Sequence, residues 1–177
     1  MFHLITGGSG SGKSEYAEQK LMEYASHSKR NKKRYYIATM MPFGKETEEK
    51  IARHRRLRAG KGFETIECYT DLKKAAEILQ TKETGSVLLE CMSNLVANEM
   101  YDPSGAGENA EESILAGIRK LQKVSDDLVV VTNEVFSDSM TDNPELLGKL
   151  NLRMGEMADL VTEVVYGIPV ERKDIKK

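Results

Sequence analysis

A glycine-rich segment, Gly7-Gly8-Ser9-Gly10-Ser11-Gly12-Lys13-Ser14, constrains this chain more than any other feature of its sequence. It matches the pattern G-x-x-x-x-G-K-[ST], in which backbone N–H groups converge on an anion without interference from Cβ atoms. The segment lies between a short apolar run and a helical pattern, an arrangement typical of a nucleotide-binding loop. We therefore expect Lys13 to reach the β- and γ-phosphates and the Ser14 hydroxyl to bind Mg²⁺.

Short apolar runs alternate with helical patterns along the whole chain. The runs predict strands over 2–6, 34–39, 63–68, 86–90, 127–132 and 160–166. The three- to four-residue periodicity predicts helices over 14–26, 45–59, 71–80, 93–100, 110–124 and 144–158, with Asp71 as an N-cap. This alternation is typical of a three-layer α/β fold, a mostly parallel sheet with helices on both faces.

Composition limits the class of protein. The 177 residues, 40% of them hydrophobic, suit one core and predict a single domain over 1–177. The 28 acidic and 26 basic residues give a net charge of −2, which argues against a general nucleic-acid coat or a binder of anionic membranes. Two cysteines make no disulfide framework, and we expect no signal peptide, no membrane span and a cytoplasmic location.

An acidic residue is expected near the metal, at the end of a neighbouring buried strand. Two candidates fit: Glu90 ends the run 86–90, and Glu134 follows the run 127–132. Glu90 is favoured as the metal-site acid and Glu134 is the alternative, because the sequence alone does not rank them.

His54 lies among cations in the segment Arg53-His54-Arg55-Arg56-Leu57-Arg58. On a helix, His54 and Arg58 share a face, and Lys50 lies on that face too. Surrounding cations favour the neutral, nucleophilic imidazole and could bind nucleotide phosphates, so His54 could attack an α-phosphate. The competing interpretation is a solvated basic helix face, which spacing alone favours. His3 and His27 carry no such signal; His3 is expected to pack or to reach solvent at the start of its strand.

Together, these motifs resemble the bifunctional adenosylcobinamide kinase / adenosylcobinamide-phosphate guanylyltransferase family of cobalamin biosynthesis. The resemblance covers nearly the whole chain, in order. The matching segments are LITGGSGSGKSEYAE at 4–18, YIAT at 36–39, KIARHRRLR at 50–58, TIEC at 65–68, LLECMSNLVAN at 88–98, VVVTNEV at 129–135, the N-x-R-x-x-x-x-A-D pattern at 151–159 and VYG at 165–167.

The resemblance implies a RecA-like P-loop fold, a homo-oligomer and two reactions. A nucleoside triphosphate, GTP or ATP, phosphorylates the aminopropanol arm of adenosylcobinamide. GTP then guanylylates His54, and the substrate phosphate takes the GMP to give adenosylcobinamide-GDP. Lys13 is the second catalytic residue, and Ser14 with Glu90 forms the Mg²⁺ site. The implied nucleotide-binding residues are Gly7, Gly8, Ser9, Gly10, Ser11, Gly12, Lys13, Ser14, Ala38, Thr39, Met40, Arg55, Arg56, Leu57, Arg58, Glu67 and Glu90.

The chain departs from the family pattern at two places. Position 10 is Gly, where many members have an arginine, and the interval 136–150 is shorter and lacks the family's R-x-F-R-D-x-x-G segment. Two alternatives therefore stay open: a P-loop kinase of another small alcohol, and a non-catalytic GTP-binding homologue. A regulatory GTPase fits poorly, because Asn31-Lys32-Lys33-Arg34 lacks the aspartate of N-K-x-D.

Overall fold

The computed structural model describes residues 1–26, 33–135 and 144–175, with the side chains of Glu46 and Leu57 outside the description. The strands are β1 (Phe2–Thr6), β2 (Lys33–Ala38), β3 (Phe63–Glu67), β4 (Gly85–Glu90), β5 (Asp127–Val131), β6 (Leu160–Val165) and β7 (Ile168–Asp174). The helices are α1 (Lys13–Ser26), α2 (Gly44–Arg58), α3 (Leu72–Gln80), α4 (Met92–Tyr101), the 3₁₀ turn η1 (Gly107–Asn109), α5 (Ala110–Val124) and α6 (Pro144–Met157).

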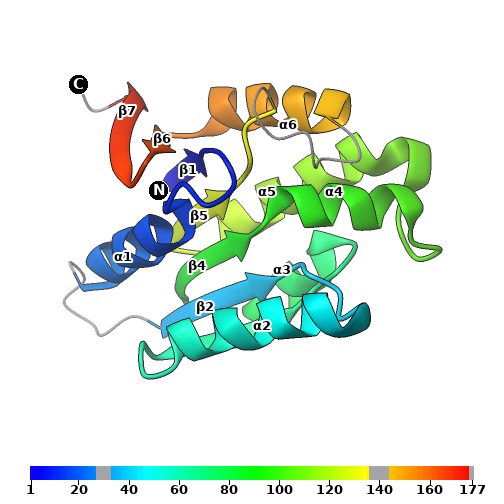
Figure 1. Ribbon diagram of the computed structural model, residues 1–177, viewed down its shortest axis with the longest axis horizontal. Coiled ribbons are helices and arrows are strands. Elements are labelled where there is room, and N and C mark those ends of the chain that lie inside the picture. Colours follow the sequence, from blue (N-terminus) through cyan, green and yellow to red (C-terminus); the bar gives the residue numbers. More distant parts are fainter. Residues whose placement is uncertain (27–32, 136–143, 176–177) are drawn as a thin grey trace.

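The seven strands form one sheet in the order β3-β2-β4-β5-β1-β6-β7 (Figure 1). Strands β1 to β6 run parallel, and β7 pairs antiparallel with β6. Parallel strands need crossover connections, and helices supply these between the successive strands of β1 to β6. All six parallel strands therefore end at one edge of the sheet, which is where ligands bind in open α/β sheets.

Alternation along the strands divides the core between the two faces of the sheet. On β1, Phe2 and Leu4 belong to the larger cluster, which includes buried residues of α3, α4, α5 and α6. Ile5 faces the other way and packs with Ala17 and Leu21 of α1. Successive strand residues point to opposite faces, so a strand buried on both faces reads as a continuous apolar run. The predicted three-layer α/β architecture is confirmed.

The structure differs from the sequence-based predictions at strand β7 and at the N-cap of α3. The sequence analysis did not predict β7, whose residues Ile168–Asp174 are mostly exposed and charged because the strand lies at the edge of the sheet. Asp71 does occupy the N-cap position of α3, but its side chain makes no capping hydrogen bond. Its φ of 51° is left-handed, and its backbone N–H donates to the buried Glu99 carboxylate at 2.7 Å.

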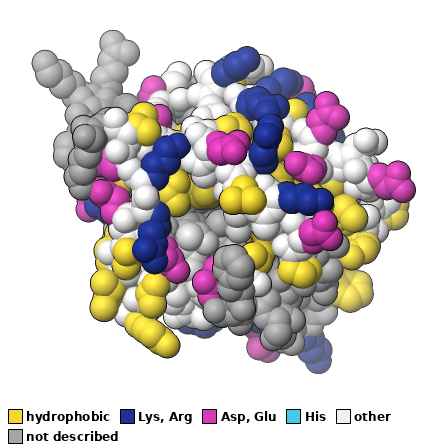
Figure 2. All heavy atoms as spheres, turned by 90° about the horizontal axis from the view of Figure 1, so that it is seen from above, with side chains coloured by type: hydrophobic (Ala, Val, Ile, Leu, Met, Phe, Trp, Pro, Cys, Tyr) yellow, Lys and Arg dark blue, Asp and Glu magenta, His cyan; other side chains and the backbone are white. Residues whose placement is uncertain are grey.

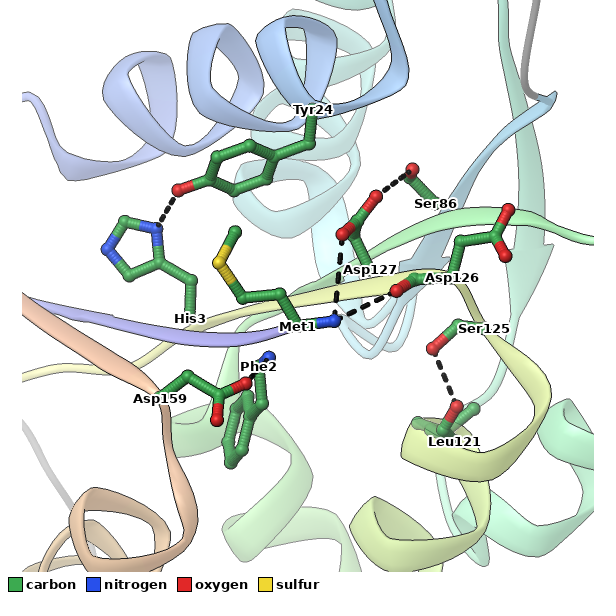
Figure 3. A network of polar contacts seen from close by, with 10 residues as sticks. All are labelled: Met1, Phe2, His3, Tyr24, Ser86, Leu121, Ser125, Asp126, Asp127 and Asp159. Carbon is green, nitrogen blue, oxygen red and sulfur yellow. Dashed lines mark hydrogen bonds and ion pairs between the residues drawn. The ribbon is translucent and has the colours of Figure 1, made fainter. Parts of the chain in front are cut away.

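Polar contacts tie the amino ends of the strands together (Figure 3). The Met1 ammonium donates to the Asp126 carbonyl oxygen at 2.9 Å and lies 3.6 Å from the Asp127 carboxylate. The Phe2 N–H donates to the Asp159 carboxylate at 2.7 Å, which connects β1 to the end of the α6–β6 connection. Asp159 ends the N-x-R-x-x-x-x-A-D pattern, so this residue of the pattern has a structural role.

His3 is fully buried, so of the two expected outcomes, packing or reaching solvent, the structure shows packing. Its Nδ1 lies 2.9 Å from the Tyr24 hydroxyl (Figure 3), and its Nε2 lies 2.8 Å from the Thr162 hydroxyl. Burial, and secondarily the charge of Lys20, lowers the pKa of His3 from 6.5 to about 4. The imidazole is therefore held neutral between two hydroxyl groups.

The surface carries charges of both signs. Figure 2 shows acidic and basic side chains interspersed over one face, with hydrophobic side chains between them. Within the described part of the chain, no helix has the length and apolar character needed to cross a membrane.

We predict that stability declines below neutral pH in a way that depends on His3. Because the folded-state pKa lies below the unfolded value, the unfolded chain binds the proton first, and stability falls as pH drops from 6.5 toward 4. Urea unfolding at pH 7 and pH 5 should show a loss that is about 2 kcal/mol smaller in His3→Gln than in the original chain. An equal loss in both proteins would contradict the neutral, buried imidazole.

Candidate functional site

The glycine-rich loop 7–14 leads from β1 into the first turn of α1, and hydrogen bonds within the loop hold its shape. The Ser11 N–H donates to the Gly8 carbonyl oxygen at 3.1 Å, and the Lys13 ammonium donates to the same oxygen at 2.9 Å. A Cβ atom on Gly7 would lie 2.5 Å from the Val164 carbonyl oxygen, so only glycine fits there. The Ser11 hydroxyl is buried and has no hydrogen-bond partner among the described residues. A loop of this kind leaves donors available for an anion.

Glu90 lies at the carboxyl end of β4 and connects the loop to the neighbouring strands. Its side chain is 8% exposed, and one carboxylate oxygen accepts a hydrogen bond from the Ser14 hydroxyl. The other oxygen accepts one from the Tyr36 hydroxyl of β2 at 3.0 Å. Burial, followed by the charge of Glu90, raises the pKa of Tyr36, so its hydroxyl stays protonated and keeps donating.

Arg58, the last residue of α2, lies flat on the ring of Tyr36. The guanidinium carbon is 3.4 Å from the ring centre, a close cation–π contact. The side chain is only 7% exposed, and its Nε and Nη1 atoms have no hydrogen-bond partner among the described residues. We call Ser14, Tyr36, Arg58 and Glu90 the Glu90 cluster.

A buried cation with unpartnered donors is energetically costly. Each unsatisfied buried donor costs about 1–3 kcal/mol, and more where the group is charged. Glu90 accepts hydrogen bonds from Ser14 and Tyr36. Neither Glu90 nor Tyr36 accepts a hydrogen bond from Arg58 in the described contacts. An anion bound against Arg58 would supply the acceptor that these donors lack.

The segment after β2 is held against the same edge by its own polar contacts. The Thr39 hydroxyl lies 3.1 Å from the Glu90 carbonyl oxygen and accepts the Cys91 N–H at 2.9 Å. The Asn98 amide of α4 donates to the Thr39 and Tyr69 carbonyl oxygens at 2.8 and 2.9 Å. These contacts place the half-buried Ala38 and Met40 beside the strand that carries Glu90.

The other arginines of the segment 53–58 are exposed. Arg55 pairs with Glu67 at 2.6 Å, and the Tyr69 hydroxyl donates to the other Glu67 oxygen at 3.0 Å. Arg56 is exposed, and His54 is half-buried one helical turn before Arg58. Residues four apart share a helix face, so His54 lies on the face that Arg58 turns toward β2. Leu57 belongs to α2, but its side chain lies outside the description.

Glu134, the alternative acid, also reaches the glycine-rich loop. Its N–H donates to the Gly7 carbonyl oxygen at 3.3 Å, and its carboxylate lies 3.6 Å from where a Cβ atom of Gly8 would be. Only Glu90 contacts Ser14 in the described hydrogen bonds. The structure thus joins Ser14 to Glu90 directly and Arg58 to Glu90 through Tyr36, whereas Arg55 pairs with Glu67.

Sequence reasoning overlooked three residues that shape this site. Tyr36 joins Glu90 to Arg58, and Asn98 fixes the segment after β2. The Gly167 N–H, in the turn before the unpredicted β7, donates to the Ser11 carbonyl oxygen at 2.8 Å. A tyrosine in an apolar strand and an asparagine within a buried helix are polar groups that need partners, and this signal could have identified Tyr36 and Asn98.

Two solved structures resemble this fold. A KaiC-like protein of Pyrococcus horikoshii OT3 matches with a TM-score of 0.54 at 11% identity, over 92% of this chain and 69% of that one. The flagellar accessory protein FlaH of Methanocaldococcus jannaschii matches with a TM-score of 0.55 at 12% identity, over 98% of this chain and 78% of that one. At such identities the likeness shows the fold alone, and it confirms the predicted RecA-like P-loop class.

Comparison with known sequences identifies the family of this chain, which the likeness of folds does not. Two curated relatives are both called bifunctional adenosylcobalamin biosynthesis protein CobU, one from Salmonella typhimurium and one from Escherichia coli K12. Each is 28% identical to this chain, over 98% of this chain and the whole of the relative. The family described as cobinamide kinase / cobinamide phosphate guanyltransferase matches residues 3–172. Its profile spans the loop, the Glu90 cluster and His54, and this chain therefore belongs to that family of transferases.

Proposed function

We propose that this protein phosphorylates adenosylcobinamide with a nucleoside triphosphate, and then transfers GMP from GTP to the product through His54. Family membership supports the pair of reactions. The observation that carries the nucleotide site is Arg58, a buried guanidinium with unpartnered donors on the ring of Tyr36, whose hydroxyl donates to Glu90. A triphosphate in the glycine-rich loop would supply the missing acceptor.

The first reaction transfers the terminal phosphoryl group to the alcohol of the substrate's aminopropanol arm. The hydroxyl oxygen forms a bond to the γ-phosphorus and releases its proton to solvent, while the bond from the γ-phosphorus to the bridging oxygen breaks and a nucleoside diphosphate leaves with the electron pair. Backbone N–H groups of the loop and the Lys13 ammonium orient the phosphates and offset their charge. Lys13 donates to Gly8 within the loop, a contact that the phosphate oxygens would replace.

Ser14 and Glu90 fit a magnesium ion that is bound together with the nucleotide. Their oxygen atoms are in direct contact, and oxygen donors are the ligands that Mg²⁺ prefers. The described residues contain no group of three or more acidic, histidine or cysteine side chains able to hold a metal. This suits Mg²⁺, which takes one or two protein ligands and completes its shell with water and phosphate. When bound, the ion offsets negative charge on the phosphates.

The second reaction uses His54 as a nucleophile. An imidazole nitrogen forms a bond to the α-phosphorus of GTP, the bond to the bridging oxygen breaks, and pyrophosphate leaves with its electron pair. A phosphate oxygen of adenosylcobinamide phosphate then attacks the same phosphorus and the imidazole departs, which gives adenosylcobinamide-GDP. The place of His54 on the α2 face that carries Arg58 supports this role, because Arg58 would hold phosphates beside that face.

We predict that His54→Ala abolishes covalent labelling of the protein by GTP carrying label at the α-phosphate. The expected label is acid-labile and base-stable, as a phosphorus–nitrogen bond requires, and phosphorylation of adenosylcobinamide should persist. Arg53→Ala, an exposed neighbour on the same helix, is the matched control and should label normally.

Label that persists in His54→Ala would refute the guanylyl-histidine. Absence of label in the original chain, with phosphorylation of another small alcohol in place of adenosylcobinamide, would instead favour the alternative of a P-loop kinase without guanylyl transfer. Failure of both reactions despite GTP binding would favour a non-catalytic homologue.

We further predict opposite effects of Arg58→Met on stability and on nucleotide affinity. Methionine keeps an apolar contact with Tyr36 but removes the unpartnered donors, so the free energy of unfolding without nucleotide should stay equal or rise. Affinity for GTP should fall by about 2 kcal/mol, the range of a hydrogen bond to a charged group. Chemical unfolding and equilibrium binding measure the two effects, and unchanged GTP affinity would exclude Arg58 from the site.

A further inference from the structure

The turn between β6 and β7 lies directly against the glycine-rich loop. The Gly167 N–H donates to the Ser11 carbonyl oxygen at 2.8 Å. A Cβ atom on Gly12 would lie 3.4 Å from the Gly167 Cα, so the two backbones approach closely. The hairpin turn is therefore part of the wall of the proposed nucleotide site.

Tyr166 occupies this turn in a conformation that disfavours tyrosine. It forms a two-residue connection with Gly167 between the paired residues Val165 and Ile168. The φ angles of Tyr166 and Gly167 are 51° and 78°, and turns with two positive φ values favour Asn-Gly. The side chain is 94% exposed, so it gains almost no burial in return. The stability of the fold therefore does not explain a tyrosine at position 166.

The side chains next to Tyr166 make the tip of the hairpin apolar. Val165 is 37% exposed and Ile168 is 65% exposed, and they flank the turn on β6 and β7. The polar, glycine-rich loop thus borders an exposed patch with one aromatic and two aliphatic side chains. A purine nucleoside triphosphate has matching parts, an anionic tail and a flat base with π faces.

The order of the strands gives the direction in which such a ligand would extend. Strand β4, which carries Glu90, lies on the β5 side of β1. The contact between Glu90 and Ser14 is therefore on that side of the glycine-rich loop. The β6–β7 hairpin lies on the opposite side of β1. A triphosphate whose terminal phosphate points toward Glu90 therefore carries its ribose and base toward the hairpin.

We propose that Tyr166 stacks on the nucleobase of the phosphoryl donor, with Val165 and Ile168 beside it. This inference rests on the proposed function and adds a binding residue for the first reaction. Base–aromatic stacking tolerates any base because each has a π face, so Tyr166 accepts adenine and guanine alike. The gain in binding also explains why a residue that strains the turn occupies position 166.

Equilibrium binding of three ligands to the full chain tests the proposal. The ligands are the α,β-methylene analogues of ATP and GTP, which resist cleavage at the α-phosphate, and inorganic tripolyphosphate, which has no base. In Tyr166→Ala, affinity for both nucleotides should fall roughly tenfold, while affinity for tripolyphosphate stays the same. Tyr166→Phe should bind like the original chain, and Tyr101→Ala, another exposed tyrosine, serves as the matched control.

Tyr166→Asn separates binding from structure, because asparagine suits the left-handed turn. It should raise the melting temperature by about 2–4 °C and still bind the nucleotides roughly tenfold more weakly. Unchanged nucleotide affinity in Tyr166→Ala and Tyr166→Asn would overturn the proposal and leave the proposed function standing. An equal loss of tripolyphosphate affinity would also overturn it, since the loop itself would then be disturbed. If the original chain binds none of the three ligands, the proposed function fails as well.

Discussion

The buried carboxylate of Glu90 is the constraint on which the rest of the site depends. A carboxylate that is 8% exposed must be hydrogen-bonded, and Ser14 and Tyr36 donate one hydrogen bond to each of its oxygens. Those two bonds join three separate parts of the chain: the glycine-rich loop, β2 and β4. Tyr36 in turn contacts Arg58 through its ring, so the carboxylate is also connected to the last residue of α2. A single acidic side chain thus organises both the phosphate loop and the helix that carries His54.

Charge balance supports the proposal that a nucleotide binds at this site. Lys13 and Arg58 are both buried cations, and Arg58 keeps two donors without partners in the described contacts. Glu90 accepts from Ser14 and Tyr36, and no described contact has it accepting from Arg58. A triphosphate brings several acceptor oxygens at once and can bind to the loop, to Lys13 and to Arg58. The unpartnered donors of Arg58 lower the stability of the ligand-free protein and raise its affinity for an anion. At the amino ends of the strands, in contrast, the neutral His3 is hydrogen-bonded on both sides by hydroxyl groups.

The parts of the fold that were predicted correctly are those that local sequence patterns determine. Apolar runs identified the buried parallel strands, a shorter mixed run identified the edge strand β3, and the spacing of glycines with Lys13 and Ser14 identified the loop. Edge strand β7 was missed because exposed, charged residues such as Arg172 and Lys173 carry no burial pattern. The pairing of Tyr36 with both Glu90 and Arg58 could not be predicted either, because it joins residues far apart in sequence through a sheet register that local patterns do not contain. The roles of Arg55 and Glu67 stay predictions; the two side chains pair with each other at the surface.

The dependence of nucleotide binding on magnesium tests most directly the claim that Glu90 organises the site. Binding of the α,β-methylene GTP analogue would be titrated with Mg²⁺ in the original chain, in Glu90→Gln and in Glu134→Gln. Glutamine has nearly the same shape as glutamate, so the first variant removes the charge with little change in packing. The account predicts that Glu90→Gln needs at least about tenfold more Mg²⁺, while Glu134→Gln responds like the original chain. A Mg²⁺ response that survives in Glu90→Gln, or is lost only in Glu134→Gln, would contradict it.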